Sequence, residues 1–191
     1  FTTLIYEISS QIRDGEADDL RSVFDASLLN ALRQVHGNDQ LTSTWNYGFF
    51  RNVGYDNLDK RFMRYVLARV EQYIADNTKM QMKRSLYDLV INRGGVWGFH
   101  IEHILANNSE NYALFDNNED FFRSERNRLG GLLLMKGQDN EAAGNEPYAQ
   151  KLKSYANTLY WNETLREDSY KSKLDFTNWI AASHLNFQPY N

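Results

Sequence analysis

Residues 99–105 read FHIEHIL, a run in which polar side chains alternate with apolar ones as far as Glu102. Such alternation is typical of a short β-strand with two different faces. In a strand, His100 and Glu102 lie on one face and His103 points to the other. A carboxylate directly before a histidine suits hydrolysis, because the carboxylate can hold a divalent metal while the imidazole takes a proton from water.

Downstream, residues 127–135 read NRLGGLLLM, and Asn140 follows after a short polar stretch. The paired glycines predict a turn that leads into a buried apolar run. Asn140 then offers a third polar group to the site formed by Glu102 and His103. Glutamate and asparagine oxygens favour Mg²⁺ or Mn²⁺, and an imidazole titrates near neutral pH. The combination predicts metal-assisted hydrolysis of a phosphodiester bond.

The composition predicts one ordered domain, with or without a helical extension. The chain has 191 residues, of which 42% are hydrophobic and 14% aromatic, and it contains no cysteine. The absence of cysteine excludes disulfide bonds and thiolate metal sites. The formal net charge of −4 counts mildly against DNA binding, so a basic surface has to be local or to lie on another domain.

The chain starts at Phe1 with neither an initiator methionine nor a signal peptide, which indicates a fragment of a longer cytoplasmic protein. No apolar stretch approaches the roughly 18 residues that cross a membrane.

Helical periodicity of the apolar residues predicts helices over 20–35 and 58–74. Gly37 is the expected stop of the first helix and Asp56 the expected N-cap of the second. Between them, four aromatic residues form either part of the core or a base-stacking platform: Trp45, Tyr47, Phe49 and Phe50.

The second half of the chain mixes short elements. We expect a strand or hairpin within 96–105, a polar loop over 107–118 and a charged helix over 119–128. Further helices are expected from Pro147 to Leu159 and over 176–185. The fold class is therefore mainly α with a small ββα insertion (α+β). The expected parts are a helical lead-in (1–95), a ββα core (96–165) and a C-terminal helix (166–191).

The ordered set of segments 101–104 (IEHI), 129–134 (LGGLLL), Asn140 and Lys151 resembles a known family. It is similar to the HNH-type nuclease domain at the C-terminal end of GmrSD-like modification-dependent restriction and anti-phage proteins. These domains belong to the His-Me finger (ββα-metal) nucleases. The resemblance covers roughly residues 58–165. It implies a bacterial, cytoplasmic endonuclease that nicks or cuts double-stranded DNA. It also implies an N-terminal ParB-like NTPase domain, of the same protein or of a partner subunit, that senses modified DNA.

The resemblance also implies roles for single residues. His103 would be the general base, while Glu102 and Asn140 would hold Mg²⁺ or Mn²⁺. The chain departs from the family pattern at Gly131, where many HNH motifs have an asparagine that braces the loop of the base, and at Ala106, where many relatives have proline. Bracing must then come from elsewhere, with Asn127 as the candidate. Supporting or phosphate-binding roles fall to His100, Asn127, Arg128, Asn145 and Lys151.

Each assignment has a structural alternative. His103 can be a buried hydrogen-bonded histidine, Glu102 an ion-paired carboxylate, Asn140 a helix cap and Lys151 a solvated lysine. Arg123, Arg126 and Arg128 alternate with acidic residues, so they form either a solvated helix face or a phosphate contact. For the whole chain, the alternatives are a catalytically inactive nuclease-derived module that binds DNA or protein, and a helical interaction domain without metal affinity.

Overall fold

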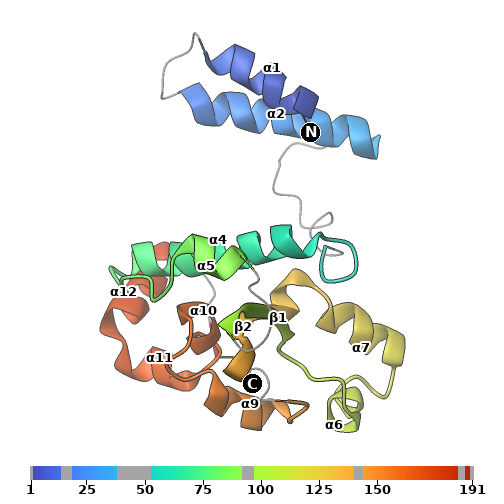
Figure 1. Ribbon diagram of the computed structural model, residues 1–191, viewed down its shortest axis with the longest axis vertical. Coiled ribbons are helices and arrows are strands. Elements are labelled where there is room, and N and C mark those ends of the chain that lie inside the picture. The colour runs from blue at the N-terminus through green and yellow to red at the C-terminus, as the bar shows by residue number, and fades with distance from the viewer. Residues whose placement is uncertain are drawn as a thin grey trace. The chain divides into compact units, whose positions relative to one another are not determined.

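The computed structural model describes residues 2–13, 19–37, 53–91, 97–139, 144–184 and 188–189 (Figure 1). The chain divides into two units, Phe1–Arg51 and Asn52–Asn191. The aromatic residues at 45–50, the Arg93-Gly94-Gly95 segment and Asn140 lie outside the described residues.

The first unit contains two helices, α1 (Thr2–Ile12) and α2 (Leu20–His36). Ile8 of α1 is buried in this unit. Helix α2 ends at Gly37, whose φ of 59° is the left-handed conformation that glycine adopts without strain. The helix expected over 20–35 and its stop are therefore confirmed, whereas the sequence did not predict α1.

The centre of the second unit is an antiparallel hairpin of β1 (Phe99–His103) and β2 (Leu132–Lys136). In its register, Phe99 pairs with Lys136 at one end and His103 with Leu132 at the other. The strand expected within 96–105 is confirmed, and the apolar run after the glycines forms its partner. Every side chain of β2 from Leu132 to Met135 is buried, because the hairpin is covered on both faces.

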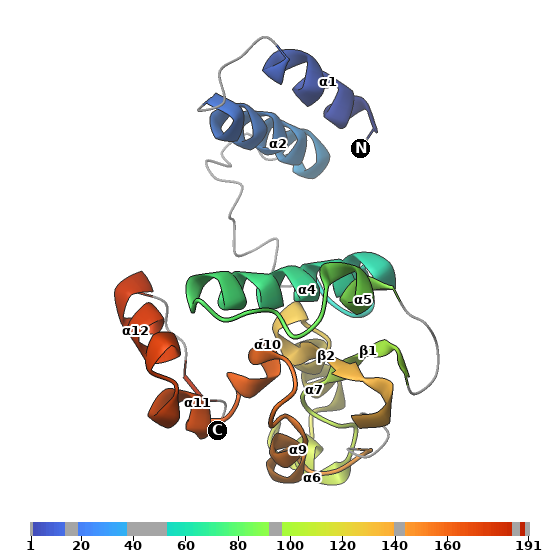
Figure 2. The same cartoon turned by 60° about the vertical axis from the view of Figure 1, so that its left-hand side comes forward.

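The two covers are helices from distant parts of the sequence. Helix α4 (Lys60–Asn77) packs Met63 and Leu67 against Leu132 and Leu134. On the other face, Leu133 and Met135 contact Ile104, Tyr155 and side chains of α9 (Tyr148–Ser154), namely Tyr148 and Leu152. Figure 2 shows the hairpin between α4 and α9. The arrangement is mainly α with one small sheet, which confirms the expected fold class.

The expected N-cap of α4 is wrong. Asp59 caps this helix by accepting hydrogen bonds from the backbone N–H groups of Arg61 and Phe62, both at 2.9 Å. Residues before Asp59 form a turn, in which Leu58 N donates to Gly54 O, so the helix cannot begin earlier. Asp56 therefore lies outside the helix, and its carboxylate is available for another partner.

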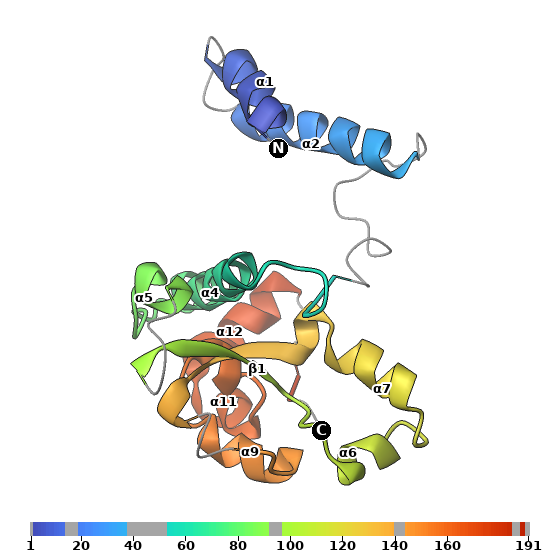
Figure 3. The same ribbon diagram turned by 45° about the vertical axis from the view of Figure 1, so that its right-hand side comes forward.

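A long connection between the strands holds α6 (Ser109–Ala113), α7 (Glu119–Arg126) and the 3-10 turn η3 (Leu129–Gly131). Figure 3 shows α6 and α7 beyond the end of β1. Helix α7 confirms the helix expected over 119–128. The loop expected over 107–118 is wrong in part, because Asn108 caps α6 by accepting from Asn111 N at 2.9 Å.

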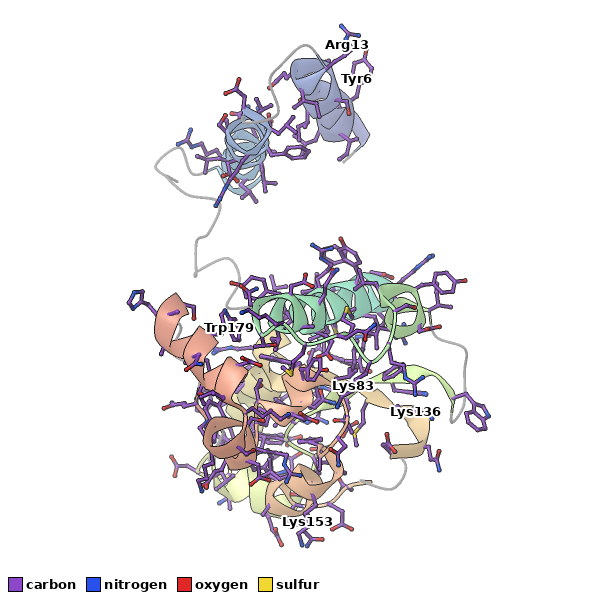
Figure 4. The ribbon with its side chains drawn as sticks, turned by 90° about the vertical axis from the view of Figure 1, so that its left-hand side faces the viewer. Tyr6, Arg13, Lys83, Lys136, Lys153 and Trp179 are labelled. Atoms are coloured by element: carbon purple, nitrogen blue, oxygen red, sulfur yellow. The ribbon has the colours of Figure 1, made fainter. Side chains whose placement is uncertain are left out.

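Short helices complete the unit: α5 (Leu86–Val90), α10 (Tyr160–Glu163), α11 (Glu167–Ser172) and α12 (Leu174–Ser183). The helix expected from Pro147 ends at Ser154 rather than Leu159. Buried Glu71 of α4 holds α10 by accepting from Tyr160 N and Trp161 N at 2.9 and 2.8 Å. Trp179 of α12 packs with Ile74 of α4 (Figure 4). The boundaries at 95 and 165 stay a prediction.

Candidate active site

His103 is the last residue of β1, and two segments hold its ring. The Tyr55 ring lies beside it, with 4.6 Å between ring centroids and 53° between planes. His103 Nε2 lies 2.9 Å from Asn127 Oδ1, at the C-terminal end of α7. The imidazole is therefore held by the loop before α4 and by the end of α7.

Asp56 determines how Asn127 faces the histidine. The Asn127 Nδ2 group donates to Asp56 Oδ2 at 2.7 Å, which leaves the amide oxygen toward His103. An amide oxygen only accepts, so Nε2 must carry the ring hydrogen and donate it. In that tautomer Nδ1 has the free lone pair. The network thus assigns Nδ1 as the atom that can take a proton from water.

The surroundings keep His103 neutral. Burial and, next, the positive charge of Arg126 together lower its pKa from 6.5 to about 4, while the Asn127 hydrogen bond acts in the opposite direction. At pH 7 the imidazole is therefore unprotonated, which is the state that a general base requires.

The segment before α4 approaches the end of α7 closely. Tyr55 N donates to Asn127 O at 2.7 Å, and Leu129 N donates to Val53 O at 3.1 Å. A Cβ atom on Gly54 would overlap the Asn127 carbonyl oxygen, so only glycine permits this approach. Sequence reasoning missed Tyr55 and Asp56 as site residues. The only local signal was a glycine followed by aromatic and acidic residues.

Glu102 points to the opposite face of the hairpin, as the alternation predicted. Its carboxylate forms an ion pair with Lys151 Nζ of α9, and the same ammonium donates to His103 O at 3.1 Å. Lys151 is only 1% exposed, so it is not the solvated lysine of the alternative reading. It neutralises Glu102 and ties α9 to the end of β1. His100 shares the face of Glu102 and pairs in register with Met135.

The backbone of Gly131 braces the chain next to His103, at the position where many HNH motifs have an asparagine. Ile104 N, directly after His103, donates to Gly131 O at 2.9 Å. A Cβ atom at position 131 would lie 2.5 Å from Arg126 O, so an asparagine does not fit here. Asn127 instead supplies the side-chain contact to His103.

The other two supporting residues, Asn145 and Arg128, have partners in different parts of the fold. Asn145 Nδ2 donates to Asn107 O and Asn108 Nδ2 donates to Asn145 O, both at 3.2 Å, which ties the loop before α9 to the loop after β1. Arg128 is ion-paired with Glu125 three residues before it. Arg128 is therefore already engaged by a carboxylate.

Glu102 is the carboxylate that β1 places at this end of the hairpin. Lys151 engages Oε1 of Glu102. Mg²⁺ takes one or two protein carboxylates and keeps several waters, so this donor chemistry fits Mg²⁺ or Mn²⁺ better than tetrahedral zinc. Within the ranges that the structure describes, no group of three or more His, Asp or Glu side chains gathers as a metal cluster.

Fold and site together place a neutral histidine and an ion-paired carboxylate at one end of a hairpin covered by helices. A family model described as GmrSD restriction endonucleases, C-terminal domain, matches residues 48–185, which include every described site residue above. The chain belongs to this family, and it is thus a restriction-endonuclease domain whose substrate is DNA. Searches of the curated proteins and of the solved structures find no match to the chain. In the described residues, we find no helix with the length and apolar character needed to span a membrane.

Proposed function

We propose that this domain is an HNH-type, metal-dependent endonuclease that hydrolyses a phosphodiester bond of double-stranded DNA, with His103 as the general base. The observation that carries the proposal is the hydrogen-bonded series Asp56–Asn127–His103, which fixes one tautomer of a neutral imidazole. A histidine that serves only as a core residue needs no such defined free lone pair.

In this mechanism a water at His103 Nδ1 attacks the phosphorus while its proton moves to Nδ1. The P–O bond to the departing strand end breaks, and the leaving oxygen takes a proton from solvent water. The new imidazolium donates a stronger hydrogen bond from Nε2 to Asn127 Oδ1, and the Asp56 carboxylate polarises that amide from behind. A DNA phosphate brings negative charge near the ring, which raises the pKa of His103 from its value of about 4 toward neutrality. The base then gains proton affinity when substrate is bound.

Glu102 and Asn140 would hold Mg²⁺ or Mn²⁺, which supplies charge neutralisation at the phosphate and at the leaving oxygen. Lys151 fixes the Glu102 carboxylate and, through His103 O, the end of β1. His100, on the same face as Glu102, is a candidate third ligand or phosphate contact.

The same family resemblance supports an N-terminal ParB-like NTPase partner that recognises modified DNA, and a bacterial cytoplasmic location. One observation favours a second function. The Lys151 ammonium occupies the carboxylate proposed for the metal, as in a catalytically inactive module that binds DNA without cutting it.

The deciding experiment follows conversion of supercoiled plasmid to open-circular or linear DNA with Mg²⁺, with Mn²⁺ and with chelator. We expect metal-dependent conversion that His103→Asn reduces at least 100-fold, because asparagine cannot accept the proton. His184→Asn is the matched control, since His184 is exposed at the end of α12 and asparagine tolerates its φ of 56°. Equal cutting by a folded His103→Asn variant would exclude the mechanism, and DNA binding without cutting would favour the inactive module.

A further inference from the structure

Arg126 sits in the last turn of α7 beside the histidine, and its guanidinium is fixed by the protein. Its Nε donates to Leu105 O at 2.9 Å, and Nη1 donates to Asn127 Oδ1 at 3.4 Å. These contacts use two of the five N–H groups of the guanidinium. The side chain is half-buried, so the charge is held in place rather than solvated.

This charge lacks the usual partner. Across the residues the structure describes, no carboxylate lies within ion-pair distance of Arg126, whereas Arg128 pairs with Glu125 and Arg166 with Asp168. A partly desolvated cation is costly unless an anion compensates it. Glu102 and Asp56 offset part of this charge from beyond ion-pair distance. The preorganised guanidinium has no carboxylate in direct contact among the described residues, which points to an anionic ligand.

The open side of Arg126 faces a pocket. The pocket has a volume of about 280 Å³, and His103, Arg126 and Arg123 share its wall. Arg123 is exposed one turn before Arg126, on the same side of α7. Two carboxylates also line the pocket, but Asp56 is engaged by Asn127 and Glu119 lies at the opposite end of α7 from Arg126.

We propose that this pocket binds a backbone phosphate of the DNA strand next to His103, with Arg126 contacting the non-bridging oxygens and Arg123 at the mouth. The placement beside the cleaved bond rests on the proposed function. A guanidinium suits this role, because its planar fork matches two phosphate oxygens at once. Arg126 thus positions the substrate.

Binding of a fluorescent 20-base-pair duplex in chelator tests the site without cleavage. We expect Arg126→Gln to weaken binding about 10-fold and to reduce the slope of log Kd against log[KCl] by about 1, as for loss of one phosphate contact. Arg126→Lys restores the slope but only part of the affinity, because an ammonium lacks the fork. The matched control is Arg166→Gln, since Arg166 also donates to a backbone carbonyl but has Asp168 as its partner.

The results separate this site from the proposed function. Binding by Arg126→Gln equal to the wild-type chain, or no binding by the wild-type chain, overturns the phosphate site. Cleavage with Mg²⁺ is measured in parallel, so wild-type binding without cutting removes the nuclease proposal alone. Thermal unfolding checks each variant, and if Arg126→Gln is unfolded, the affinity of Arg126→Lys decides.

Discussion

The carboxylate of Asp56 accepts a 2.7 Å hydrogen bond from the side-chain amide of Asn127, across 71 residues of sequence. This one contact orients the amide whose oxygen faces His103. It makes a residue of the loop before α4 part of the proposed catalytic arrangement, acting on His103 through Asn127.

Replacing Asp56 with alanine should therefore impair catalysis more than folding. Without the carboxylate, the Asn127 amide is free to rotate, and we expect kcat to fall about 10-fold with little change in KM. Ring ¹⁵N shifts should show a mixture of His103 tautomers. The control is Asp59→Ala, which removes the cap of α4 and costs about 1 kcal/mol of stability without changing kcat. An unchanged kcat and a single tautomer in Asp56→Ala would contradict the positioning role.

Replacement of the adjacent Gly130 and Gly131 by alanine should affect stability to very different extents. A Cβ atom at Gly131 meets Arg126 O at 2.5 Å, while one at Gly130 meets nothing within 4 Å. We expect Gly131→Ala to lower the free energy of unfolding by about 2 kcal/mol or more, because a backbone must move, and Gly130→Ala to change it by less than about 0.5 kcal/mol. Urea unfolding of both variants measures this. Equal stabilities would show that the η3 turn adjusts freely.

Stability without metal should depend on His103. The pKa of this histidine falls from 6.5 in the unfolded chain to about 4 in the folded protein, mainly through burial. Because the unfolded state binds the proton more tightly, the stabilisation is complete above pH 6.5 and is lost as the pH falls toward 4. We expect a loss of about 1–2 kcal/mol, discounted because part of the ring contacts solvent. Urea unfolding in chelator should show this dependence in the wild-type chain and a flatter profile in His103→Asn.

The buried Lys151–Glu102 pair offers a test of the metal ligand that does not use cleavage. Lys151→Met leaves Glu102 without its cation and should cost about 3 kcal/mol of stability, which the double variant with Glu102→Gln should largely regain. If Glu102 binds Mg²⁺, the ion should raise the melting temperature of Lys151→Met but not of the double variant. An equal Mg²⁺ response in both variants would remove Glu102 from the metal site.

Local patterns predicted the strand and the helices with a clear period, but they did not predict which residues meet. Alternation along β1 placed Glu102 and His103 on opposite faces, and periodicity located α2 and α4, because both signals depend on near neighbours. Asp56 and Asp59 look equally suited to begin α4, and only the fold distinguishes the cap from the partner of Asn127.

The arginines of α7 give the same lesson. Arg126 and Arg128 have different partners: Arg128 is paired with Glu125, whereas Arg126 donates to the carbonyl of Leu105, after β1. The short helix α6 was missed because five residues carry no period, and its Asn108 cap resembles a loop residue. The roles of Glu102 and Asn140 as metal ligands, and the metal itself, stay predictions.

The close backbone contact between Gly54 and the Asn127 carbonyl has a consequence for the folding of the domain. Joining segments so far apart in sequence costs loop-closure entropy, which the contacts formed here must offset. In a molecule with an intact hairpin but with residues 53–56 undocked, we expect the Asn127 amide to be unoriented, because Asp56 no longer accepts from it. Such a molecule would not cleave DNA, so the proposed nuclease activity would begin only when residues 53–56 are docked.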